Sequence, residues 1–310
     1  MSEQKVINFM GRRKLAAIFS VLLLLGAIGS LSTKGLQLGL DFTGGTQIEV
    51  GYEEPANLEV IRGQLQAAGF ENAVVVHFGS ETDVLVRLQR NAEEGADANL
   101  GDSVMSALSR EANGNIELRR IEFVGPQVGE ELRDDGGLGM MFALAVVMLY
   151  VAMRFQYKFS VGAVAALIHD VILVLGFFSV IGMDFDLTVL AAVLAVIGYS
   201  LNDTIVVSDR IRENFRKLRG MTSVEVINVS LTQTLGRTLI TSLTTILVLL
   251  ALFFFGGEMI HGFSTALLVG VLVGTYSSIY VAANVLLAMN IDKEDLMLPV
   301  KEGEEFEEVP

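Results

Sequence analysis

The chain has 310 residues, of which 52% are hydrophobic and only 19% are charged, and its formal net charge is −14. Ordinary soluble domains carry about 25% charged residues, and here stretches such as 15–31 and 262–291 carry none. Because a bilayer span needs about 20 apolar residues, a soluble monomer is excluded and a polytopic α-helical membrane protein in contact with lipid is predicted. No basic domain exists, which excludes nucleic acid as a partner.

The apolar stretches predict six transmembrane helices. The first, 15–31, follows a cytoplasmic N-terminus at 1–14. Its basic start resembles a signal peptide, but no clean cleavage site follows, so an uncleaved signal anchor is expected. The remaining helices are expected at 137–153, 160–182, 187–208, 238–256 and 262–289. A loop at 209–237 and an acidic cytoplasmic tail at 290–310 complete this division.

Basic residues orient the predicted helices. The N-terminal segment, the loop after the second helix and the loop after the fourth all carry Lys or Arg, whereas the two short opposite loops carry none. By the excess of positive charge on the inner side, both termini are expected in the cytoplasm. The long segment 32–136 is then expected in the periplasm of a bacterial cell, with the chain in the inner membrane.

The segment 32–136 is long enough for one small domain. Alternating or β-rich stretches predict strands at 45–50, 73–78, 83–88 and 116–124, and helical spacing predicts helices at 55–70 and 97–112. The order βαββαβ favours an α+β ferredoxin-like sandwich with both helices on one face of the sheet.

Polar groups inside a bilayer are costly and often serve function. Asp203 in the fourth helix and Arg237 at the start of the fifth are expected at matched depth, and they carry neighbours that could form a polar seam: Asn202, Thr241 and Thr245. In one interpretation Asp203 and Arg237 form a structural ion pair. In the other, Asp203 carries a proton, and protonation releases Arg237.

His169 and Asp170 in the third helix are weaker candidates for a proton relay, and a packing or hydrogen-bonding role is an equal alternative. Gly270 and Gly274 have the spacing of close helix packing, although glycine occurs in such apolar helices by chance as well.

No motif for enzymatic chemistry is present. The chain has no Cys, which excludes thiolate metal sites and Cys nucleophiles. It contains no Gly-x-x-x-x-Gly-Lys-Ser/Thr, His-Glu-x-x-His or Gly-x-Ser-x-Gly sequence. No cofactor and no metal are therefore expected.

Several segments together resemble the SecF branch of the SecD/SecF family of bacterial protein-export subunits, within the resistance-nodulation-division superfamily. The resemblance covers nearly the whole chain. The segments are 39–46, with Asp41-Phe42-Thr43-Gly44-Gly45, then 124–129, His169-Asp170, 198–214 and 232–238.

This resemblance implies a non-enzymatic subunit that pairs with SecD and uses the proton motive force to promote translocation of preproteins through the SecYEG channel. It also implies association with YajC and YidC, and proton transport at the positions of Asp203 and Arg237 together with an Asp on SecD. The alternative is a non-conducting scaffold that stabilises SecD or the Sec channel.

Overall fold

The computed structural model describes residues 6–71, 73–88, 100–109, 116–292 and 295. Apart from residues 290–292 and 295, the predicted acidic tail lies outside the described residues. So do residues 1–5 and both ends, 97–99 and 110–112, of the second helix predicted in the domain.

Six helices in the described part of the chain are long and apolar enough to cross a membrane, so the prediction of six transmembrane helices in a multi-pass membrane protein is confirmed. A short 3₁₀ turn, Met10–Arg12, leads into the first of them. The helices are α1 (Arg13–Thr33), α5 (Pro126–Arg154), α6 (Tyr157–Ile181), α7 (Leu187–Lys217), α8 (Ser223–Phe255) and α9 (Glu258–Ala288).

Three helices extend well beyond their predicted ends. Helix α5 begins at Pro126 rather than at 137, with the proline at the first helical position. The segment 209–237, expected as a loop, is mostly helix, and only residues 218–222 lie between α7 and α8. A stretch without charged residues marks only the part of a helix that lies in the hydrocarbon core, which is about 30 Å thick. The 31 residues of α7 extend about 46 Å at 1.5 Å per residue, so the helix continues beyond that core.

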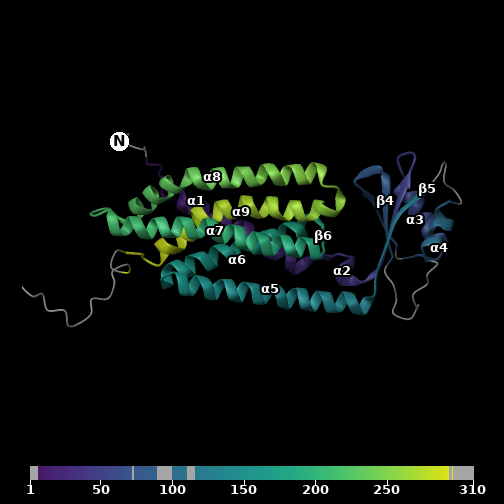
Figure 1. Ribbon diagram of the computed structural model, residues 1–310, viewed down its shortest axis with the longest axis horizontal. Coiled ribbons are helices and arrows are strands. Elements are labelled where there is room, and N and C mark those ends of the chain that lie inside the picture. The colour runs from purple at the N-terminus through teal and green to yellow at the C-terminus, as the bar shows by residue number, and fades with distance from the viewer. Residues whose placement is uncertain (1–5, 72, 89–99, 110–115, 293–294, 296–310) are drawn as a thin grey trace, which may run out of the picture.

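Helices α5 and α8 lie at opposite edges of the bundle, with α6, α7 and α9 between them (Figure 1). In α6 and α7, 56% of the most apolar 18-residue stretch is buried, against 6% in α5 and 17% in α8. Helices α7 and α9 approach closely where a Cβ on Gly270 would lie 2.1 Å from Val196 Cγ2 and one on Gly274 would lie 3.1 Å from Ser200 Cβ. The predicted close packing at these two glycines is thus confirmed.

The small domain lies at one end of the bundle (Figure 1). Its elements follow the predicted βαββαβ order: β2 (Gly45–Tyr52), α3 (Leu58–Ala67), β3 (Val74–Phe78), β4 (Ser80–Leu88), α4 (Leu100–Ser109) and β5 (Ile116–Val124). The four strands form an antiparallel sheet in the order β3-β4-β2-β5. Ile48 pairs with Val86, and both pack with Leu65 of α3 and Leu108 of α4 in one buried core, which confirms the α+β prediction.

The chain between α1 and the sheet is bound to the bundle by hydrogen bonds. Strand β1 (Gln37–Leu38) pairs in parallel with β6 (Asp184–Phe185), which lies between α6 and α7. In the following short helix α2 (Leu40–Thr43), the carboxylate of Asp41 accepts a hydrogen bond from the backbone N–H of Leu187, the first residue of α7, at 3.0 Å. This contact satisfies one of the free N–H groups at the positive end of the helix.

Two consecutive glycines end α2. Gly44 has a φ of 67° and Gly45 a φ of 126°, a backbone conformation that residues with a Cβ rarely adopt. A Cβ on Gly45 would also lie 2.6 Å from the carbonyl oxygen of Leu88. The turn into β2 therefore depends on glycine at both positions.

Candidate functional site

The polar centre of the bundle contains two buried carboxylates, Asp170 on α6 and Asp203 on α7. Asp203 is 7% exposed and lies about 24 Å along α7 from its first residue. Its Oδ1 accepts a hydrogen bond from Thr238 Oγ1 of α8 at 2.8 Å, and its Oδ2 accepts one from Ser278 Oγ of α9 at 3.0 Å. Among the described residues, two hydroxyl groups and no cation bind this carboxylate.

The ion pair expected between Asp203 and Arg237 is not formed. Arg237 is exposed and, within the described residues, makes no salt bridge to a carboxylate within 4.0 Å. Matched depth does not fix rotation: successive residues of a helix point about 100° apart. The residue that faces Asp203 is therefore Thr238, the next along the chain, while Arg237 points away from the bundle.

The hydroxyl groups predicted to form a seam with α7 also face away from it. Thr241 donates to the carbonyl oxygen of Arg237 at 3.0 Å, and Thr245 donates to that of Thr241 at 2.9 Å. Both side chains thus bond to their own helix and lie on the outer face with Arg237. The exposed Arg237 and Thr241 and the half-buried Thr245 form a polar face on α8 within a predominantly apolar helix.

Asn202 is exposed as well, at the end of a row of small or polar side chains on α7. We call this row the small-residue face; its members are Thr188, Ala191, Ala195, Gly198 and Asn202. Their spacing of three and four residues places them on one side of the helix. A Cβ on Gly198 would meet no atom within 4 Å. Small residues at this spacing are typical of helix–helix interfaces in membranes, yet no helix of the described chain covers them.

Asp170 is fully buried, at 0% exposure. Its Oδ2 accepts hydrogen bonds from Ser200 of α7 at 2.5 Å and Ser277 of α9 at 2.7 Å. Its Oδ1 lies 2.9 Å from Nδ1 of His169, whose Nε2 is buried and has no hydrogen-bond partner in the described part of the chain. The two sequence candidates in α6 therefore contact each other and belong to one polar cluster.

Sequence reasoning missed four residues that bind the two carboxylates: Ser200, Thr238, Ser277 and Ser278. A signal was present in α9, where two consecutive serines interrupt an apolar helix. Serine in such a helix commonly bonds to its own backbone, so the sequence alone did not indicate carboxylate partners.

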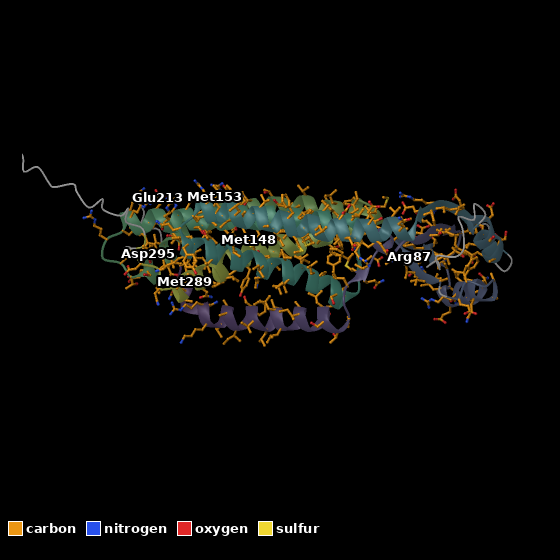
Figure 2. All side chains as sticks on the ribbon, turned by 90° about the horizontal axis from the view of Figure 1, so that it is seen from below. Arg87, Met148, Met153, Glu213, Met289 and Asp295 are labelled. Carbon is orange, nitrogen blue, oxygen red and sulfur yellow. The ribbon has the colours of Figure 1, made fainter. Side chains whose placement is uncertain are left out.

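The junction between the sheet and the bundle contains a second polar group. Arg87 of β4 forms a salt bridge with Asp184 of β6, and Figure 2 shows Arg87 where the domain meets the bundle. The hydrogen bond from its guanidinium to Asp184 raises the pKa of Arg87. A cavity of about 420 Å³ beside this pair is lined by residues of both parts, including Val76 of the sheet and Met259 of α9.

Neither polar region offers a metal site: in the described ranges, no group of three or more His, Asp or Glu side chains could hold a metal ion.

Comparison with known proteins connects this arrangement to protein export. Residues 104–292 match the family described as protein export membrane protein SecD/SecF, C-terminal, and residues 29–56 match the SecD/SecF GG motif. The protein translocase subunit SecF of Vibrio alginolyticus is 53% identical over 312 residues, covering 100% of this chain and 99% of that protein. The corresponding subunit of Pseudomonas aeruginosa is 56% identical over 294 residues, 94% of each chain.

Two solved structures are similar in fold. The crystal structure of SecDF, a translocon-associated membrane protein from Thermus thermophilus, superimposes with a TM-score of 0.84 at 37% identity. That of SecDF in a super-membrane-facing form gives 0.69 at 38% identity. The alignments cover 94% and 93% of this chain but only 39% of each SecDF chain. This chain therefore spans well under half the length of those proteins.

Proposed function

We propose a proton-driven role in protein export for this chain, which belongs to the SecF family of protein translocase subunits. The observation that carries the proposal is Asp203, a carboxylate buried within a membrane helix, to which the described residues contribute two hydroxyl donors and no cation. Burial favours its neutral form and hydrogen bonding favours its charged form. A change in hydration or in the charge of a partner can therefore cause Asp203 to bind or release a proton.

The energy available from each proton is sufficient for such a role. One charge crossing the membrane releases about 2.3 kcal/mol per 100 mV. A difference of about 1.4 kcal/mol changes a two-state population ratio tenfold. Protonation of Asp203 would remove its negative charge from Thr238 and Ser278, and so alter the contacts that α7 makes with α8 and α9.

The proposed partner is SecD. The polar face with Arg237, Thr241 and Thr245 and the small-residue face that ends at Asn202 both lie uncovered on the bundle. An arginine and a row of small residues are poorly suited to lipid and well suited to a second helical bundle. We propose that SecD covers both faces and contributes the acidic group that pairs with Arg237.

We further propose the wider setting that accompanies this family: association with SecYEG, YajC and YidC, and promotion of preprotein movement through the channel. The basic ends of the helices are proposed to lie in the cytoplasm together with both termini. The sheet domain is proposed to lie in the periplasm, and the bundle in the inner membrane.

The principal test is Asp203→Asn in cells that contain SecD, with proton flux and preprotein export as readouts. We expect loss of at least about tenfold in proton-dependent export, given the energy per proton. Asp209→Asn is the matched control, since Asp209 lies on the same helix but is 40% exposed and pairs with Arg154. Normal export by an assembled Asp203→Asn complex would refute proton carriage and favour the non-conducting scaffold.

A second test addresses the partner. Because the chain has no Cys, a photoreactive, thiol-specific cross-linker can be attached to one introduced cysteine at a time. The test variant is Ala195→Cys on the small-residue face, and the control is Phe142→Cys on α5, where Phe142 is 72% exposed. We expect cross-linking to SecD from position 195 and to lipid from position 142. Equal labelling of lipid from both positions would contradict the proposed interface.

A further inference from the structure

Two adjacent residues of α9 each donate a hydrogen bond to a different buried carboxylate. Ser277 Oγ lies 2.7 Å from Asp170 Oδ2, and Ser278 Oγ lies 3.0 Å from Asp203 Oδ2. The carboxylates belong to neighbouring helices, α6 and α7. One peptide unit of α9 therefore connects the two acidic groups of the bundle.

Each serine also has a second acceptor in its own helix. Ser277 Oγ lies 3.2 Å from the carbonyl oxygen of Gly274, and Ser278 Oγ lies 3.0 Å from that of Thr275. A hydroxyl group has a single proton to donate. A charged carboxylate is the stronger acceptor, so each serine is expected to donate to the carboxylate when it is ionised. When the carboxylate is protonated, the serine can return to the carbonyl.

The surroundings of Asp170 permit both of its protonation states. Full burial opposes the charged form, whereas donation from Ser200, Ser277 and Nδ1 of His169 supports it. Nδ1 of His169 lies 2.9 Å from Oδ1 of Asp170, so one proton can be shared between the two side chains.

The ionisable groups around this cluster come from three helices. His169 lies on α6, Tyr276 of α9 has its ring 6.2 Å from the His169 ring, and Asp203 lies on α7. Within the described chain, α1 and α5 contribute no ionisable side chain that bonds to either carboxylate. The phenol of Tyr276 bonds to α1, because its hydroxyl group donates to the carbonyl oxygen of Ala16 at 2.8 Å.

We propose that Asp170 is a second protonation site, coupled to Asp203 through Ser277 and Ser278. The proposal deepens the proton-driven function and rests on it. Uptake of one proton from water converts the Asp170 carboxylate to the acid and frees Ser277 from it. Because Ser278 follows directly in α9, the changed hydrogen bond of Ser277 and the loss of the nearby negative charge change the proton affinity of Asp203, and the two groups titrate as a coupled pair.

The test is infrared difference spectroscopy of the full chain in lipid vesicles as a function of pH, which resolves the carbonyl band of a protonated carboxylic acid. We expect two titrating bands in the wild type, loss of one in Asp170→Asn and of the other in Asp203→Asn, and a displaced midpoint for the band that remains. A wild-type spectrum and titration in Asp170→Asn would overturn the proposal, as would an unmoved midpoint for the remaining band.

Since Asp170→Asn could prevent folding, Ser277→Ala and Ser278→Ala provide a second comparison that keeps both carboxylates. Loss of one donor to a charged group changes the ratio of protonated to ionised carboxylate about tenfold at a given pH. We expect Ser277→Ala to act mainly on the Asp170 band and Ser278→Ala mainly on the Asp203 band. Titrations identical to wild type in both variants would refute the coupling.

Failure of this inference is distinguishable from failure of the proposed function. If Asp203→Asn abolishes export but Asp170 shows no titrating band, only the second site is refuted. If export survives Asp203→Asn while both bands titrate, the coupled pair exists but does not drive export.

Discussion

The contact between α7 and α9 provides a quantitative test of how tightly the bundle is packed. A Cβ on Gly270 would lie 2.1 Å from Val196 Cγ2 and 3.0 Å from Val196 Cβ, whereas carbon atoms in contact are normally about 3.5–4.0 Å apart. Valine in a helix has essentially one side-chain rotamer, so the methyl group cannot swing aside and the helices must separate. Overpacking of this kind costs about 1–3 kcal/mol, and we expect Gly270→Ala to lower the free energy of unfolding by that amount.

The measurement is equilibrium unfolding of the full chain in mixed detergent micelles, followed by circular dichroism. Gly139→Ala on α5 is the control, because a Cβ there meets nothing within 4 Å and the change should stay within about 1 kcal/mol. Adding Val196→Ala removes the obstructing methyl groups, so the double variant should be more stable than the sum of the single effects predicts, by about 0.5–3 kcal/mol. Equal stability of Gly270→Ala and Gly139→Ala, or strict additivity, would refute the reasoning.

Three further predictions concern other parts of the molecule. Leu65→Ala empties a fully buried position of the domain core and should destabilise the domain by about 2–5 kcal/mol, seen as faster amide exchange in the sheet but not in the bundle. Thr222→Ala removes the hydroxyl that caps α8 and should cost about 1 kcal/mol in unfolding experiments, while Thr222→Ser should not. The hydrogen bond from Lys158 lowers the pKa of Asp295, so this contact stabilises the fold above the ordinary carboxylate range and is lost as pH falls through the lowered value. A fluorescent probe that reports on residue 295 should therefore show its release from Lys158 as the pH is lowered. A signal that does not change with pH, and that Asp295→Asn leaves unchanged, would contradict this prediction.

The sequence was sufficient for the number of membrane helices and for the order of the domain's elements, because both depend on local patterns of charge and hydrophobicity. It did not predict where α7 ends or where α8 begins, since a helix can continue into water when its caps allow it, as Thr222 does with Glu225 at the start of α8. It also assigned the wrong partner to Asp203. Depth follows from counting residues, but the rotation that brings Thr238 rather than Arg237 to the carboxylate is set by packing against several helices.

The parallel pair formed by β1 and β6 has a mechanical consequence. Its backbone hydrogen bonds, together with the contact of Asp41 with the start of α7, join the connection between α6 and α7 to the segment that leads into the sheet. Any tilt of α6 or α7 would therefore displace the segment β1–α2, from which the chain enters the sheet. The salt bridge between Arg87 and Asp184 adds a second attachment at the same end. The sheet would therefore rotate as a rigid body together with the end of the bundle, and not move independently of it.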